Sequence, residues 1–168
     1  MSVGRWVTLC AALAVLSACG FHMRREVSLP AGMQRVNVQI ADPFSPLKRD
    51  LEAALTRSGA SVENAPGPGV AEITISAVSL APVVRSVGAK AYVNEFSMVY
   101  HVELSITGGD GATLLANQVI EHSRDYTFDQ TQAIGTSAEQ DEIKKEMERN
   151  MVQAVMRRVE AAAHKLEK

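Results

Sequence analysis

The chain has 168 residues, of which 46% are hydrophobic, 5% aromatic and 21% charged. This length favours one domain, and the charged fraction is typical of a folded protein. The 17 Lys and Arg residues are balanced by 19 Asp and Glu residues, which gives a formal net charge of −2. Nucleic-acid-binding proteins carry a basic surface and aromatic stacking residues, so we expect no nucleic-acid partner.

The first 18 residues have the pattern of a targeting segment. Arg5 precedes an apolar run that is long enough for a signal peptide, but shorter than the roughly 20 residues that span a bilayer. The run ends in Leu16-Ser17-Ala18-Cys19-Gly20, which resembles the lipobox of bacterial lipoproteins. Cleavage before Cys19, followed by acylation of its thiol and its new amine, would supply a stable membrane anchor. The alternative is a secreted protein in which Cys19 stands by chance.

Removal of the signal peptide (residues 1–18) would leave 150 residues with 16 basic and 19 acidic side chains, a net charge of −3. Cys10 would be lost with the signal and Cys19 would carry lipid, so the folded domain would have no disulfide and no Cys metal ligand. We therefore predict a lipidated tether over residues 19–34 and a single domain over 35–168. A packed core must stabilise that domain, because a chain of this size can bury about 68–70% of its surface.

The sequence of the first half of the domain predicts two strands that flank a helix. Residues 34–40 alternate apolar and polar side chains, which is typical of a strand. Ser45-Pro46 predicts the start of a helix and Gly59 its end. A second strand is predicted over residues 71–80, with a bulge where its alternation slips, whereas residues 82–90 are predicted to be irregular. This order predicts a right-handed crossover between parallel strands.

The second half predicts a long hairpin followed by a long helix. Residues 94–107 are apolar at every second position, and Gly108-Gly109-Asp110-Gly111 predicts a turn into a further strand over 113–128. One face of this hairpin is expected to be buried and the other to be polar and lightly charged. A helix is predicted from residue 138, with Ser137 as the N-cap of a capping box. Its apolar stripe comprises Ile143, Met147, Met151, Val155, Val159, Ala162 and Leu166.

The sequence carries no pattern that indicates an enzyme. The four histidines are scattered, with no His-Glu-x-x-His metal motif, and no serine stands in a Gly-x-Ser-x-Gly turn. His101 and His122 lie on neighbouring predicted strands, and we interpret both as surface or hydrogen-bonded histidines rather than ligands. We expect no catalytic residue, no metal site and no cofactor apart from the lipid on Cys19.

A family resemblance is carried by several short motifs. Cys19-Gly20-Phe21-His22-Met23-Arg24 resembles the start of the mature protein in the LPS-assembly lipoprotein family, LptE. Asp42-Pro43, Glu95–Met98 and Glu139–Met147 are also similar to that family, so the resemblance covers essentially the whole chain. It implies an α+β two-layer sandwich, in which a four-stranded mixed sheet that includes the long antiparallel hairpin is covered on one face by two helices.

The resemblance also implies a function and partners. It implies a Gram-negative outer-membrane lipoprotein, facing the periplasm, that plugs and helps assemble the LptD β-barrel and assists insertion of lipopolysaccharide into the outer leaflet. Gly20 after the cysteine resembles the pattern of lipoproteins that are sent to the outer membrane. The alternative is a generic periplasm-facing lipoprotein that binds another envelope partner or ligand.

Lipopolysaccharide carries phosphates, for which Arg is a suitable partner because its fork binds two oxygens. Arg85 matches a basic family position associated with lipopolysaccharide contact, and Lys90 and Arg124 are further candidates on sequence alone. A second basic family position, between the last strand and the final helix, is not matched, because this chain has Gly135-Thr136-Ser137 there.

The anchor is directly testable. Cys19→Ala removes the thiol that receives the diacylglyceryl group, so we expect the variant to lack covalent lipid. Mass spectrometry of the protein isolated from native membranes checks this, with the wild-type chain as the acylated control. An unmodified Cys19 in the wild-type protein would refute the anchor.

Overall fold

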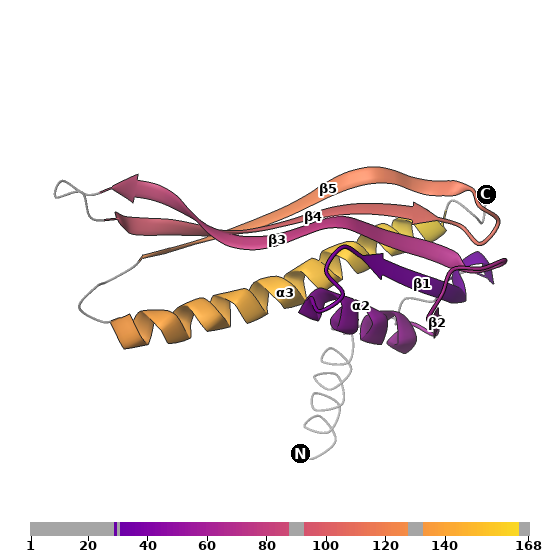
Figure 1. Ribbon diagram of the computed structural model, residues 1–168, viewed down its shortest axis with the longest axis horizontal. Coiled ribbons are helices and arrows are strands. Elements are labelled where there is room, and N and C mark those ends of the chain that lie inside the picture. The colour runs from indigo at the N-terminus through magenta and orange to yellow at the C-terminus, as the bar shows by residue number, and fades with distance from the viewer. Residues whose placement is uncertain (1–28, 30, 88–92, 128–132, 165–168) are drawn as a thin grey trace, which may run out of the picture.

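The computed structural model describes residues 29, 31–87, 93–127 and 133–164. One five-stranded sheet has the strand order β2-β1-β3-β4-β5, and two long helices cover one of its faces (Figure 1). The predicted two-layer class, with two helices on one face of a mixed sheet, is confirmed. In chain order the elements are η1 (Ala31–Met33), β1 (Arg35–Ile40), α2 (Pro46–Arg57), β2 (Ser61–Glu63), β3 (Ala71–Val87), β4 (Val93–Thr107), β5 (Thr113–Thr127) and α3 (Ala133–Ala163).

The sheet has one strand more than the four predicted. The additional strand, β2, has three residues and pairs in parallel with β1 at the sheet edge. Asn37 Nδ2 donates to the main-chain oxygen of Glu63 at 2.7 Å, and Arg35 Nε donates to the Glu63 carboxylate at 2.9 Å. Ser61-Val62-Glu63 is too short for a periodic pattern, so contacts with β1 rather than local preference create this strand.

The predicted parallel pairing is confirmed, since α2 connects β1 to strands that pair with it in parallel. Ser45 is the N-cap and its Oγ accepts from the Leu47 backbone N–H at 3.3 Å, while Pro46 occupies the first helical turn. Gly59 follows the C-cap with φ of +87°, a conformation that suits glycine. The helix places four side chains in the core, Leu47, Leu51, Ala54 and Leu55.

Strand β3 is longer than predicted, because it continues through the segment that we expected to be irregular. Pro82 lies within it, opposite Met98 of β4. β1 pairs with β3 only as far as Ile75, so no described strand pairs with that edge of the remainder of β3. Proline is tolerated at such an edge. The predicted bulge is confirmed by a register shift between Ile75 and Ala77.

The hairpin of β4 and β5 was predicted within one residue at each outer end. Its turn also contacts the loop that precedes β3, because the Gly69 N–H donates to the Gly109 carbonyl at 3.1 Å. A Cβ atom on Gly109 would lie 2.8 Å from the backbone carbon of Gly69. Glycine is therefore required at residue 109 for this close approach.

Helix α3 begins at Ala133, five residues before the predicted start. The capping box assigned to Ser137 is therefore wrong. Once a preceding turn is helical, the backbone groups near Ser137 join the intrahelical ladder and need no cap. The apolar stripe is confirmed over the described part of the helix, and its buried members are Ile143, Met147, Met151, Val155, Val159 and Ala162.

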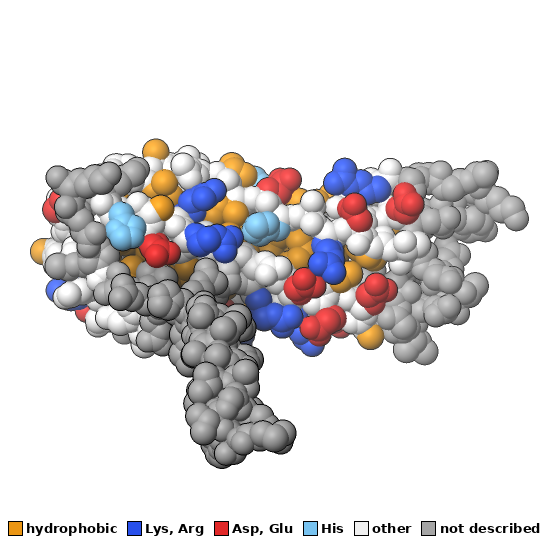
Figure 2. Space-filling view, turned by 180° about the vertical axis from the view of Figure 1, so that it is seen from behind, with side chains coloured by type: hydrophobic (Ala, Val, Ile, Leu, Met, Phe, Trp, Pro, Cys, Tyr) orange, Lys and Arg blue, Asp and Glu red, His pale blue; other side chains and the backbone are white. Residues whose placement is uncertain are grey.

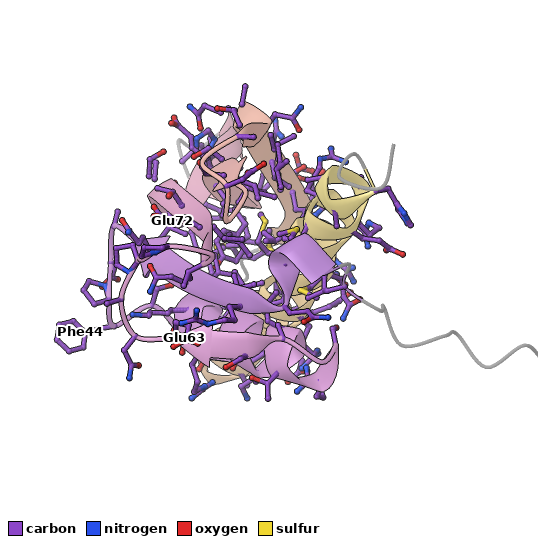
Figure 3. The ribbon with its side chains drawn as sticks, turned by 90° about the vertical axis from the view of Figure 1, so that its right-hand side faces the viewer. Phe44, Glu63 and Glu72 are labelled. Carbon is purple, nitrogen blue, oxygen red and sulfur yellow. The ribbon has the colours of Figure 1, made fainter. Side chains whose placement is uncertain are left out.

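The core lies between this stripe and the helix-facing side of the sheet. Helix α3 packs on β4 and β5 and contacts α2, which covers β1 and β2 (Figure 1). Viewed along the length of the molecule, Phe44 projects away from the body on the side opposite α3 (Figure 3). This ring is 94% exposed, although the Asp42 carboxylate accepts from the Phe44 backbone N–H at 3.0 Å.

The core assignment predicts a large stability loss for Met151→Ala. Met151 is fully buried, so truncation removes apolar burial and leaves a cavity. We expect the free energy of unfolding to fall by about 2–5 kcal/mol, measured by urea denaturation. The exposed Arg158→Ala on the same helix should change it by less than about 0.5 kcal/mol. Equal, small effects of the two changes would contradict the packing of α3.

Candidate functional site

The sheet face turned away from α2 and α3, here called the open face, is covered by no described helix or strand. Side chains alternate between the two faces of a strand, so the registers of β3, β4 and β5 fix which residues share it. Its polar members include Glu72, Thr74, Ser79, Arg85, Glu95, Ser97, His101, Glu103, Ser105, Thr107, Glu121, Ser123, Asp125 and Thr127.

The open face carries more carboxylates than the sequence of any single strand indicates. The register gathers carboxylates from β3, β4 and β5 on one surface, whereas Arg85 is the one Lys or Arg among the described residues of this three-strand surface. A polar face is confirmed, but the expected light charge is not. The carboxylates are Glu72, Glu95, Glu103, Glu121 and Asp125.

A hydrogen-bonded cluster surrounds Glu103 on this face. Its carboxylate accepts from Asn117 Nδ2 at 3.2 Å and from Ser76 Oγ at 3.3 Å. His101 lies between Glu103 and Glu121, with nitrogen-to-oxygen distances of 3.7 and 3.6 Å. The hydrogen bond from Asn117 lowers the pKa of Glu103 most, partial burial opposes it, and Ser76 and His101 lower the pKa further. Glu103 is therefore ionised at neutral pH.

The cluster does not have the geometry of a metal centre. Among the residues that the structure describes, no group of His, Cys, Asp or Glu is arranged to hold a metal ion. His101 and His122 do not form a joint site either. His101 pairs across from Glu121, whereas His122 pairs across from Tyr100, so the two imidazoles lie on opposite faces of the sheet.

Arg85 lies on the open face near the end of β3. Its Nη2 is 3.4 Å from Ser97 Oγ and its Nε is 3.9 Å from Asp125 Oδ1, and the side chain is 55% exposed. A shallow pocket of about 280 Å³ surrounds it, lined by Arg85, Glu95, Phe96, Asp125, Tyr126 and Thr127. Two carboxylates therefore face one guanidinium, which makes this pocket a weak attractor for an anion.

Arg124 lies on the other side of the sheet, facing α3. Its Nη1 donates to Glu146 Oε1 at 3.1 Å. A cavity of about 220 Å³, here called the notch, opens between β5 and α3. The notch is lined by His122, Ser123 and Arg124 of β5 and by Glu146, Met147, Asn150, Gln153 and Arg157 of α3.

The structure therefore separates residues that the sequence analysis treated as neighbours. Arg85 and Arg124 lie on opposite faces of the sheet and contact different partners. Lys90 and Cys19 lie outside the described residues, and Thr136 belongs to the first turns of α3. The predicted roles of Arg85, Lys90, Arg124 and Cys19 thus remain predictions.

Sequence reasoning missed Arg157. On α3, Glu146, Asn150, Gln153 and Arg157 follow the helical spacing of one face, adjacent to the apolar stripe. That spacing was readable from the sequence, but nothing in it showed that this face meets β5. On the rear side of the molecule, basic, acidic and histidine side chains alternate with apolar ones, and neither charge forms a continuous patch (Figure 2).

No helix in the described ranges is both long enough and apolar enough to cross a membrane.

Comparison with known proteins shows similarity over most of the chain. It is 26% identical over 159 residues to the "LPS-assembly lipoprotein LptE" of Pectobacterium atrosepticum, which covers 92% of this chain and 85% of that protein. The Yersinia pestis protein of the same name is 26% identical over 160 residues, and the similarity covers 92% of this chain and 75% of that protein.

Solved structures agree with this similarity. The solution structure of an uncharacterized lipoprotein B from Nitrosomonas europaea superposes with a TM-score of 0.71 at 28% identity, covering 84% of this chain and 91% of the other. Rare lipoprotein B from Shewanella oneidensis shares the fold, with a TM-score of 0.69 at 21% identity, covering 80% of this chain and 99% of the other.

The family model for LptE, described as lipopolysaccharide-assembly, matches residues 33–159, which include both helices almost completely and all five strands. A family of assembly lipoproteins also accounts for the lack of catalytic motifs that the sequence shows. The chain belongs to the LptE family of lipopolysaccharide-assembly lipoproteins.

Proposed function

We propose that this chain is the lipoprotein subunit of an outer-membrane lipopolysaccharide translocon, anchored in the periplasmic leaflet by lipid on Cys19. It fills and helps assemble an LptD-type β-barrel and assists insertion of lipopolysaccharide into the outer leaflet. The observation that carries this proposal is the family match, which extends over nearly the whole folded domain rather than over one motif. Relatives from two Gram-negative genera carry the name of LPS-assembly lipoproteins.

The open face is the surface that we assign to the barrel. Both helices lie on the other face, so the sheet itself is available for contact. The lumen of a transmembrane barrel is polar, which suits the Ser, Thr and carboxylate side chains of this face. The charge of the face further implies that the lumen wall opposite it is basic, because complementary potentials favour association.

The exposed Phe44 extends the same side of the molecule (Figure 3). Its loop is held at both ends, because the Ala41 N–H donates to Ile75 of β3 and the Ser45 N–H donates to Asp42. The backbone of this loop is therefore already ordered, so binding through the loop costs little backbone conformational entropy. Phe44 therefore fits the role of an apolar anchor beside the acidic surface.

Val119→Lys tests the assignment of the open face to the barrel. Val119 is 56% exposed and lies opposite Glu103, so an added ammonium group changes the surface without entering the core. We expect the wild-type chain to co-purify with a large outer-membrane barrel. The variant should give at least about tenfold less complex, since a cation placed against a basic lumen wall is repelled, which costs several kcal/mol.

Ala53→Lys on the exposed side of α2 is the matched control and should leave the yield unchanged. Emergence of the wild-type chain alone from native membranes would refute the translocon function. Equal yields for Val119→Lys and wild type would refute only the choice of face.

Arg85→Gln tests direct contact with lipopolysaccharide. The change removes one charge-assisted donor while adding no carboxylate to an acidic surface, so capture of lipopolysaccharide by the purified chain should fall by about three- to tenfold. Barrel co-purification, measured in parallel, should be retained. Unchanged capture would mean that Arg85 is simply a solvated charge near Asp125.

A further inference from the structure

The notch between β5 and α3 is a second polar site, which shares only Ser123 with the open face. It lies at the edge of the sheet, because β5 is the last strand, and on the side of the sheet that carries the helices. Two arginines, one glutamate, two amides, a histidine and a serine line it, while Met147 supplies apolar wall. We propose that the notch binds a phosphomonoester group, with Arg124 and Arg157 as its cationic donors.

The charge of the notch is the first argument. Arg124 and Arg157 outweigh Glu146, so the lining carries a formal charge of +1 with His122 neutral. The chain as a whole carries −2, and the open face gathers most of the sheet's carboxylates. The local positive potential of the notch attracts an anion, which the acidic remainder of the protein repels.

The availability of donors is the second argument. Arg157 is exposed and has no hydrogen-bond or ion-pair partner among the described residues. Arg124 uses Nη1 for Glu146, and a guanidinium has five N–H donors, so several of its donors are available to a ligand. A forked guanidinium matches the oxygens of phosphate, so two arginines in one notch form a suitable cradle.

The remaining lining groups suit a phosphate that is attached to a polar body. The amides of Asn150 and Gln153 lie between Glu146 and Arg157 along α3 and offer both donors and acceptors. His122 Nε2 is buried and has no hydrogen-bond partner among the described residues. An unpaired polar atom costs free energy, and a small shift of the ring toward a ligand oxygen in the notch would relieve that cost.

The size of the notch limits what it can hold. Its volume of about 220 Å³ is below the roughly 300–1,000 Å³ of pockets that enclose drug-sized ligands. The notch therefore accepts one headgroup or one free phosphate, with the rest of any larger ligand outside. This inference depends on the notch alone, so it can fail while the barrel assignment stands, and the reverse also holds.

The test uses the purified full-length chain with two phosphate sources. Titration with inorganic phosphate is followed by NMR shifts of α3 and β5 amides, and vesicles of phosphatidylcholine with phosphatidic acid present the same group on a lipid. Two control anions test selectivity for the phosphomonoester. Phosphatidylglycerol, a phosphodiester of similar charge, is presented in vesicles, and acetate is titrated in solution. Binding of inorganic phosphate identifies a free-phosphate site, whereas selective binding of phosphatidic acid identifies a lipid headgroup site, and either supports the proposal.

Arg157→Gln should weaken binding of the phosphate probe by about tenfold or more, because charge-assisted hydrogen bonds are lost. Arg158→Gln is the matched control, since Arg158 is the exposed neighbour on α3 that does not line the notch, and it should change affinity less than about twofold. Arg157→Lys keeps the charge but loses the fork, so an intermediate affinity is expected.

Glu146→Gln gives a result that partial unfolding cannot produce. It removes the carboxylate that engages Arg124, so the affinity for phosphate should rise by about threefold or more. The proposal is overturned if neither phosphate source binds, if acetate or phosphatidylglycerol binds as well as the phosphomonoester, or if Arg157→Gln and Arg158→Gln weaken binding equally. Loss of affinity in Glu146→Gln would overturn it as well.

Discussion

Burial of one face of β4 beneath α3 is the constraint on which the other features of this molecule depend. Five alternate residues of β4 are buried, and the apolar stripe of α3 covers them. The period of a strand is two, so a slip of one residue would expose all of these side chains at once. The core therefore fixes the register of β4, and with it the residues that β3 and β5 place on each face. The buried residues are Met98, Tyr100, Val102, Leu104 and Ile106.

The same register divides the charge of the molecule. Carboxylates from three strands meet on the open face, where two of them approach His101. Arg124 and Arg157 meet on the helix side, at the sheet edge, around Glu146. The small net charge of the chain conceals this separation. An acidic surface for a protein partner and a basic notch for a small anion can therefore coexist on one domain.

Local signals predicted the elements whose ends are set by local chemistry. Ser45 caps α2 and Gly59 ends it, because a hydroxyl satisfies an orphan N–H and glycine adopts a positive φ. The missed elements depend on distant partners. Strand β2 exists because Glu63 contacts β1, and Pro82 fits in β3 because no described strand pairs with that edge of β3. The early start of α3 carried no capping signal that could be read from the sequence.

The sequence by itself determined the lipobox at Cys19 as a prediction, the alternation of β4, the apolar stripe of α3 and the family resemblance that the comparisons confirmed. Each of these features depends on a short or regularly spaced set of residues, so local periodicity and chemistry suffice to predict it. Only the tertiary structure decided that Arg85 and Arg124 lie on opposite faces and that Arg157 shares a notch with His122. These positions follow from the pairing of strands and the docking of α3, which the burial of whole faces determines, and no local pattern records which faces will meet.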